Sequence, residues 1–227
     1  MQLESPGRRM QWIQLVYDNS FSSVFEYEEA FRTGKIDWEP VLRGGCPLCG
    51  ERGCCRRISP YMRRAVALFP YCEGMVPIAR FQCRSLIRTF SLLPYQLAPY
   101  HAYTVESMIL AVVLWAEIHA AGDGGAGAAV EELPGDCEVT PWLLRSWLGI
   151  VIVGLRRAHS VLCTWIELTD IRSGEDTAEK LGEVSRYVRR LGSRGPPLRE
   201  AIQRYIRQSK RHLLGIPSQE RRRLSAG

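Results

Sequence analysis

The sequence predicts a mainly α-helical protein. A small zinc-ribbon-like β module comes first, followed by a helix-turn-helix-type bundle and two C-terminal helices. Two observations lead to this prediction. The first is a Cys-x-x-Cys turn at Cys46 and Cys49, followed at a distance by Cys83, because spaced thiols of this kind are typical of small metal-stabilised modules. The second is a run of apolar segments with helical spacing, bounded by capping and stop signals, that begins near Thr104.

These signals divide the chain of 227 residues into five expected parts. The boundaries follow shifts in composition and charge. They are an N-terminal segment at 1–42, the zinc-ribbon-like module at 43–100, the helix-turn-helix-like domain at 104–170, basic C-terminal helices at 171–215 and a disordered basic tail at 216–227.

The first hundred residues give few strong secondary-structure signals. A short helix is expected around Ser22–Arg32, with Gly34 as its stop signal. In the module, short strands are expected at Phe81–Cys83 and Arg88–Ser91, on either side of a knuckle turn.

The helical part has clearer boundaries. Thr104 is a predicted N-cap, and Gly122 to Gly125 ends the apolar helix that follows. Thr140-Pro141 is a second strong start, because proline at the first helical position loses no hydrogen bond. The expected helices after the first are 126–133, 141 to about 157, 159–169, about 174 to 191, and 198–214.

A zinc ribbon needs four soft ligands around one tetrahedral Zn²⁺ ion. Cys46, Cys49 and Cys83 supply three, but position 86, where a second knuckle would carry its last cysteine, holds Leu86. The sequence leaves several substitutes open: Cys54, Cys55, Cys72 and, more weakly, His101. We name Cys72 as the fourth ligand because it lies in a turn-like segment. The alternative is a fold that persists without metal.

Charge is unevenly distributed along a chain whose net charge is +6. Residues 43–88 carry net +7 and residues 180–223 carry net +10, whereas residues 89–179 carry net −8. Two basic blocks flanking an acidic middle favour a polyanionic partner, although solvated basic helix faces would give the same composition.

We therefore expect DNA to be the partner, with arginines on its phosphates and the helix after Thr140 facing the groove. Arginine suits bidentate phosphate contact. The candidate nucleic-acid-binding residues are Arg56, Arg57, Arg84, Arg88, Thr140, Arg145, Arg156, Arg157, Arg207 and Arg211. The acidic middle of the chain argues against DNA contact there, because phosphate neutralisation dominates affinity.

Other classes of protein are disfavoured. The longest apolar stretches, Met108–Ala116 and Trp147–Leu155, are shorter than the roughly 20 residues of a membrane span. The N-terminus lacks an apolar signal core, so a cytoplasmic protein with unpaired cysteines is expected. No phosphate-binding glycine loop or nucleophile–base pattern is recognisable, which predicts a protein that is not an enzyme.

The segment Cys83-Arg84-Ser85-Leu86-Ile87-Arg88-Thr89-Phe90-Ser91-Leu92-Leu93-Pro94 resembles a Cys-Arg-x-Cys-Gly-Arg-Thr-Phe-Ser-x-Leu-Pro signature. This signature belongs to insertion-element-associated bacterial proteins that have an N-terminal zinc ribbon followed by a helix-turn-helix. Residues 46–50, 97–103, 139–148 and 213–218 are similar to the same family. The resemblance implies a transposase-like DNA-binding module with Cys46, Cys49 and Cys83 as ligands. Leu86 and Ile87 depart from it.

The sequence thus predicts a DNA-binding accessory or regulatory protein, related to transposases but without a catalytic domain. A second copy of the chain is a further candidate partner. The alternative is a helical protein–protein interaction module, the remnant of a decayed mobile element, in which the helices carrying Met108, Trp142 and Trp147 bury a partner.

Overall fold

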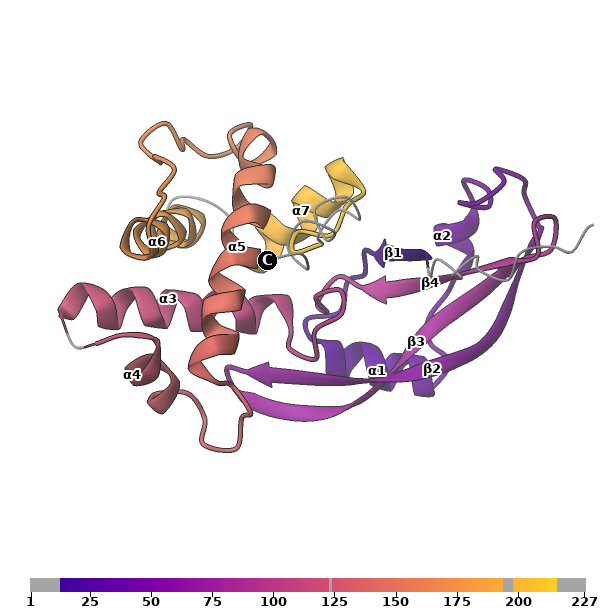
Figure 1. The fold of residues 1–227 in the computed structure, drawn as a ribbon. Coiled ribbons are helices and arrows are strands. Elements are labelled where there is room, and N and C mark those ends of the chain that lie inside the picture. Colours follow the sequence, from indigo (N-terminus) through magenta and orange to yellow (C-terminus); the bar gives the residue numbers. More distant parts are fainter. Residues whose placement is uncertain (1–12, 123, 194–197, 216–227) are drawn as a thin grey trace, which may run out of the picture.

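The structure, a computed structural model, describes residues 13–122, 124–193 and 198–215. Within these residues a four-stranded sheet extends to one side of a group of helices (Figure 1). The strands are β1 (Ile13–Tyr17), β2 (Cys55–Leu68), β3 (Tyr71–Cys83) and β4 (Arg88–Pro94). The helices are α1 (Val24–Arg32), α2 (Glu39–Leu42), α3 (Val105–Ala121), α4 (Ala126–Glu131), α5 (Pro141–Leu162), α6 (Thr177–Ser193) and α7 (Leu198–Ser209). The fold is therefore mixed α and β, and the predicted mainly α class is correct only for the second half.

The sheet is larger than the sequence predicts. Its order is β1-β4-β3-β2, with β2, β3 and β4 antiparallel and β1 parallel to β4. The two expected short strands are the end of β3 and the start of β4. The long β2–β3 hairpin and β1 were not predicted.

The sheet also joins two parts that were expected to be separate. Strand β1 pairs with β4 from Ile13↔Phe90 to Tyr17↔Pro94, so the expected boundary at residue 42 runs through one sheet. Helix α1, capped by Ser23, packs against β3, and the buried Tyr27 hydroxyl donates a 2.8 Å hydrogen bond to the carbonyl of Pro77.

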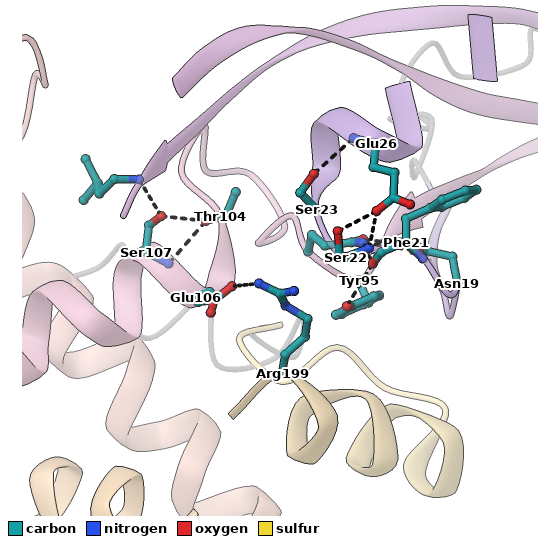
Figure 2. A network of polar contacts seen from close by, with 12 residues as sticks. Asn19, Phe21, Ser22, Ser23, Glu26, Tyr95, Thr104, Glu106, Ser107 and Arg199 are labelled. Carbon is teal, nitrogen blue, oxygen red and sulfur yellow. Dashed lines mark hydrogen bonds and ion pairs between the residues drawn. The ribbon is translucent and has the colours of Figure 1, made fainter. Parts of the chain in front are cut away.

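The predicted start of α3 is confirmed, and it fixes the helices to the sheet. Thr104 caps α3 by accepting a hydrogen bond from the amide of Ser107, and Gly122 ends the helix in the left-handed conformation. The Ser107 hydroxyl in turn accepts a 2.8 Å hydrogen bond from the backbone N–H of Leu68 at the end of β2 (Figure 2). The helical part and the hairpin therefore share one set of polar contacts.

The helix-turn-helix prediction is not met in its geometry. Helices α4 and α5 are separated by residues 132–140, whereas a helix-turn-helix joins its helices by a turn of about three or four residues. Helix α5 is capped by Thr140 as predicted, but it runs to Leu162 and packs against α3, α4, α6 and α7. Helix α5 therefore covers both the expected helix from 141 to about 157 and the start of the separate helix expected at 159–169.

The two tryptophans of α5 have opposite environments. Trp147 is fully buried and lies against Tyr103, with ring centroids 4.7 Å apart. Trp142 lies before the buried stripe that contains Trp147 and is 74% exposed. The first turn of α5 projects beyond the packed part of the helix, so the stripe begins only at Leu144.

The C-terminal helices are held by ion pairs as well as by apolar packing. Arg156 of α5 pairs with the buried Glu183 of α6, and Arg207 of α7 pairs with Asp18 after β1. The predicted disordered tail at 216–227 lies outside the described residues. Within the part that is described, no helix is long and apolar enough to cross a membrane.

His212, between α7 and the end of the described chain, makes stability depend on pH. It is 9% exposed, and burial, reinforced by the charge of Arg63, lowers the pKa of His212 to about 3. An unfolded histidine binds a proton below about pH 6.5. Because the folded chain does not, we expect the free energy of unfolding to fall on acidification from pH 6.5, by up to about 1.4 kcal/mol per pH unit.

Urea unfolding of the wild type and His212→Leu at pH 7, 6 and 5 measures this contribution. The variant removes the titrating group, so its stability should change less between pH 7 and 5 than that of the wild type. Equal pH dependence in the two proteins would show that His212 is not the group responsible.

Candidate metal centre

The first half of the site is a tight turn after α2. The carbonyl of Cys46 accepts a 2.7 Å hydrogen bond from the amide of Gly50, and the Cys46 amide donates to the carbonyl of Glu51. Gly45 faces this turn so closely that a Cβ there would lie 2.3 Å from the carbonyl oxygen of Gly50. The glycines therefore let the turn close around the Cys46 and Cys49 thiols.

The second half comes from the end of the β2–β3 hairpin that lies away from α3 and α5 (Figure 1). Cys83 is the last residue of β3 and pairs in register with Cys55, the first residue of β2. Cys54 directly precedes β2, and its carbonyl accepts a hydrogen bond from the amide of Arg84. Strand pairing thus brings Cys54 to Cys83 across 29 residues of sequence.

Four cysteine sulfurs meet where the two halves join. The ligand atoms of this thiol cluster all lie within 4.8 Å of one another, and the cluster could hold a metal ion; its members are Cys46, Cys49, Cys54 and Cys83. The three predicted ligands are therefore brought together. The fourth position belongs to Cys54, which the sequence had left open beside other candidates.

The spacing of the sulfurs fits a tetrahedral ion. Metal–sulfur bonds of about 2.3 Å place tetrahedral sulfurs about 3.8 Å apart. The Sγ atom of Cys49 lies 3.3 Å from that of Cys54 and 3.6 Å from that of Cys83. The Sγ atoms of Cys54 and Cys83 are 3.9 Å apart. All these cysteines are free thiols, and the sulfurs are well beyond the roughly 2.05 Å of a disulfide.

Backbone amides support the sulfurs in both halves. The amide of Leu48 lies 3.4 Å from the Sγ atom of Cys46, and the amide of Leu86 lies 3.4 Å from that of Cys83. The turn after Cys83 thus keeps an amide on its sulfur although position 86 carries no thiol. Donors of this kind orient thiolate ligands and stabilise their charge.

The cluster also perturbs the ionisation of its thiols. Burial opposes ionisation of Cys46, but the amides of Leu48 and Cys49 and the neighbouring thiols outweigh it and lower the pKa of Cys46 to about 6. Burial raises the pKa of Cys55, which adjoins the cluster, to about 11. Metal ligation requires thiolates, so Cys46 is the better prepared of these two thiols.

The prediction that Cys72 completes the site is wrong. Cys72 is exposed and pairs with Ala67 at the opposite end of the hairpin from the thiol cluster. There it lines a cavity of about 240 Å³ beside the Glu106–Arg199 ion pair of Figure 2. Since β3 is 13 residues long and Cys72 and Cys83 lie near its two ends, no rotamer could bring Cys72 to the cluster.

The predicted arginines divide into two groups. Arg56, Arg84 and Arg88 are exposed on the strands and turn beside the thiol cluster. Arg57 is also exposed there, but its guanidinium lies over the rings of Phe31 and Trp38. This end of the hairpin therefore gathers four of the predicted residues.

The remaining predicted residues are scattered. Arg145 and Arg211 are exposed on different elements, and Thr140 caps α5. Three arginines are engaged in contacts that hold the fold together: Arg156 with Glu183, Arg157 with the carbonyls of Leu213 and Gly215, and Arg207 with Asp18. All three arginines therefore have structural roles, and their assignment to DNA contact stays a prediction.

Comparison with known proteins adds no further assignment, because no protein-family model, curated protein or solved structure matches this chain. The class that the site itself defines is a protein with a four-cysteine centre that could hold a metal.

Proposed function

We propose that the thiol cluster binds a structural zinc ion and that the arginine-rich end of the hairpin, held in shape by this ion, binds DNA. Four sulfur ligands with tetrahedral spacing and no open position are typical of structural zinc sites. The observation that supports the proposal most directly is the cluster of Cys46, Cys49, Cys54 and Cys83.

The DNA part of the proposal rests on charge. The exposed arginines Arg56, Arg84 and Arg88 border the cluster, and exposed guanidinium groups suit phosphate contact. By contrast, the loop before α5 carries exposed acidic residues such as Asp136 and Glu138. Because DNA affinity comes largely from phosphate neutralisation, we assign the contact to the hairpin end instead of α5.

In biological terms we propose an accessory or regulatory protein. The resemblance of residues 83–94 to insertion-element-associated proteins supports a role connected with a mobile element. The alternative of a helical interaction module has less support. Met108 and Trp147, which would have contacted a partner, are buried in the core of the chain itself, and only Trp142 of these residues is exposed.

Binding of a labelled mixed-sequence duplex at 50–200 mM salt tests the proposal. We expect weak binding, with a dissociation constant of about 10⁻⁴–10⁻⁶ M near physiological salt, and an affinity that falls steeply as salt rises. Replacing Arg84 and Arg88 together by Ala should weaken binding and reduce the slope of log K against log salt by roughly 2, since each phosphate contact contributes about 0.9.

Arg145→Ala is the matched control, because Arg145 is an exposed arginine on α5, away from the hairpin end. It should leave both affinity and slope unchanged. If Arg145→Ala lost DNA binding while the Arg84/Arg88 double variant kept it, the contact would belong to α5, which would contradict the proposal. So would the absence of any binding at 50 mM salt.

A further inference from the structure

The last turn of α5 carries a second cysteine arrangement, remote from the metal centre. Cys163 is the C-cap of α5, and its side chain is exposed. His159 lies four residues earlier on the same helix, so the two side chains lie on one face. Tyr187, from the middle of α6, reaches the same point from the core.

These three side chains form a continuous hydrogen-bonded line. The Sγ atom of Cys163 lies 3.3 Å from Nε2 of His159, and Nδ1 of the same ring lies 2.6 Å from the Tyr187 hydroxyl. The His159 and Tyr187 rings are nearly perpendicular, at 88°. A thiol beside an imidazole that a third group orients is the arrangement that activates cysteine nucleophiles.

The buried end of the line keeps its proton. Tyr187 is 2% exposed, and burial, together with the charges of Glu183 and Cys163, raises the pKa of Tyr187 to about 12. It therefore stays a hydroxyl that fixes the imidazole plane. The charge of a helix C-terminus favours a cation, which supports the imidazolium of His159. His159 is thus placed to accept the thiol proton at Nε2 while Tyr187 holds the ring.

We propose that Cys163 is a modification site at which peroxides oxidise the thiol to a sulfenic acid. His159 takes the thiol proton, and the thiolate sulfur attacks one peroxide oxygen. A sulfur–oxygen bond forms as the oxygen–oxygen bond breaks, and the imidazolium proton goes to the departing hydroxide, which leaves as water. The sulfur loses two electrons and the peroxide gains them.

Cys72 provides an internal comparison for this proposal. It is also exposed, but no hydrogen bond joins it to a histidine in the described part of the chain. A free thiol is only a few per cent thiolate at pH 7. Because the imidazole of His159 lies 3.3 Å from the Cys163 sulfur and can accept its proton as the sulfur attacks, we expect Cys163 to react about tenfold faster than Cys72.

The test uses the full chain with one equivalent of zinc, treated with hydrogen peroxide at pH 7 in the presence of a sulfenic-acid trap. Mass spectrometry then gives the rate of labelling at each cysteine. We expect Cys163 to react about tenfold faster than Cys72. Similar rates at the two sites would overturn the proposal.

Two variants test the roles of the neighbours. His159→Gln, which keeps the helix, should slow Cys163 to the rate of Cys72 while leaving Cys72 unchanged, and the unchanged Cys72 rate also reports an intact fold. Tyr187→Phe keeps the buried ring and removes only the hydroxyl, so it should slow Cys163 alone, by a few-fold. A Cys163 rate that His159→Gln does not alter would contradict the proposal.

Discussion

The variant Cys54→Ser is expected to lose stoichiometric zinc, although the sequence around Cys54 carries no recognisable ligand spacing. The wild type should contain about one zinc per chain, held by Cys46, Cys49, Cys54 and Cys83. Removing one of four thiolates should lower the affinity more than about 100-fold, because even groups that only support metal ligands contribute 10–100-fold. Zinc content by elemental analysis and competition with a chelator measure the effect.

Two other cysteines are matched controls. Cys55 is adjacent in sequence, and its sulfur lies 3.9 Å from that of Cys54, but it is not a member of the thiol cluster. Cys72 lies at the far end of the hairpin. Cys55→Ser and Cys72→Ser should both retain zinc. If Cys55→Ser lost zinc and Cys54→Ser kept it, the assignment of the fourth ligand would be wrong.

A rescue variant sharpens the same prediction. The amide of Leu86 already lies against the sulfur of Cys83, so the turn has a shape that could present a thiol at position 86. Adding Leu86→Cys to Cys54→Ser should therefore restore zinc binding. No restoration would mean that the turn cannot direct a side chain toward the site.

The metal centre shows what could be predicted from the sequence. Cys46 and Cys49 were recognisable because a Cys-x-x-Cys turn with a following glycine is a local pattern. Cys54 was only one of several candidates, because it reaches the cluster through the pairing of β2 with β3, which brings it to Cys83, 29 residues away in sequence. Local spacing determines a turn, but it does not reveal a strand register.

The same contrast holds for the fold. The caps at Thr104 and Thr140 were predicted because a side chain beside a helix start acts within three residues. The hairpin was missed because the first ten residues of β2 are partly or fully exposed, with no alternation of apolar and polar positions. Strand β1 was missed because it is five residues long and pairs with a strand more than seventy residues later.

Charges were the least predictable feature. Arg145 and Arg156 have the same side chain and lie on the same helix, but one is exposed and the other is paired with a buried carboxylate. Net charge along a segment records the number of arginines and not their partners. The arginines proposed to contact DNA could therefore be separated from structural ones only after Glu183 was located.

The variant Glu183→Ala is expected to destabilise the fold far more than the loss of an exposed charge would. The Glu183 carboxylate is 1% exposed and accepts two hydrogen bonds from Arg156, at 3.0 and 2.7 Å, and a third from the amide of Gly174 at 2.8 Å. It thereby joins α5, α6 and the loop between them. Breaking a buried pair by removing one partner costs about 3–5 kcal/mol.

The size of this effect follows from what the truncation leaves behind. Without the carboxylate, the amide of Gly174 loses its acceptor in a buried position, and Arg156, whose side chain is 34% exposed, keeps only the carbonyl of Gly174 as an acceptor. Gly174 cannot move away easily, because its Cα faces Glu179 so closely that a Cβ would lie 2.4 Å from the Cβ of that residue. The unpaired donors are therefore held in place, and each costs free energy that an exposed group would recover from water.

Urea unfolding of zinc-loaded protein measures the change, with two variants for comparison. Glu183→Gln keeps an acceptor for the Gly174 amide but removes the charge. The decrease in its free energy of unfolding should therefore be smaller, about 1–3 kcal/mol. Glu200→Ala breaks the exposed Glu200–Arg204 pair on α7 and should cost less than about 1 kcal/mol, because exposed pairs contribute little. If Glu183→Ala cost no more than Glu200→Ala, Arg156 would not need its partner for folding, and the pairing would be no reason to prefer other arginines for DNA contact.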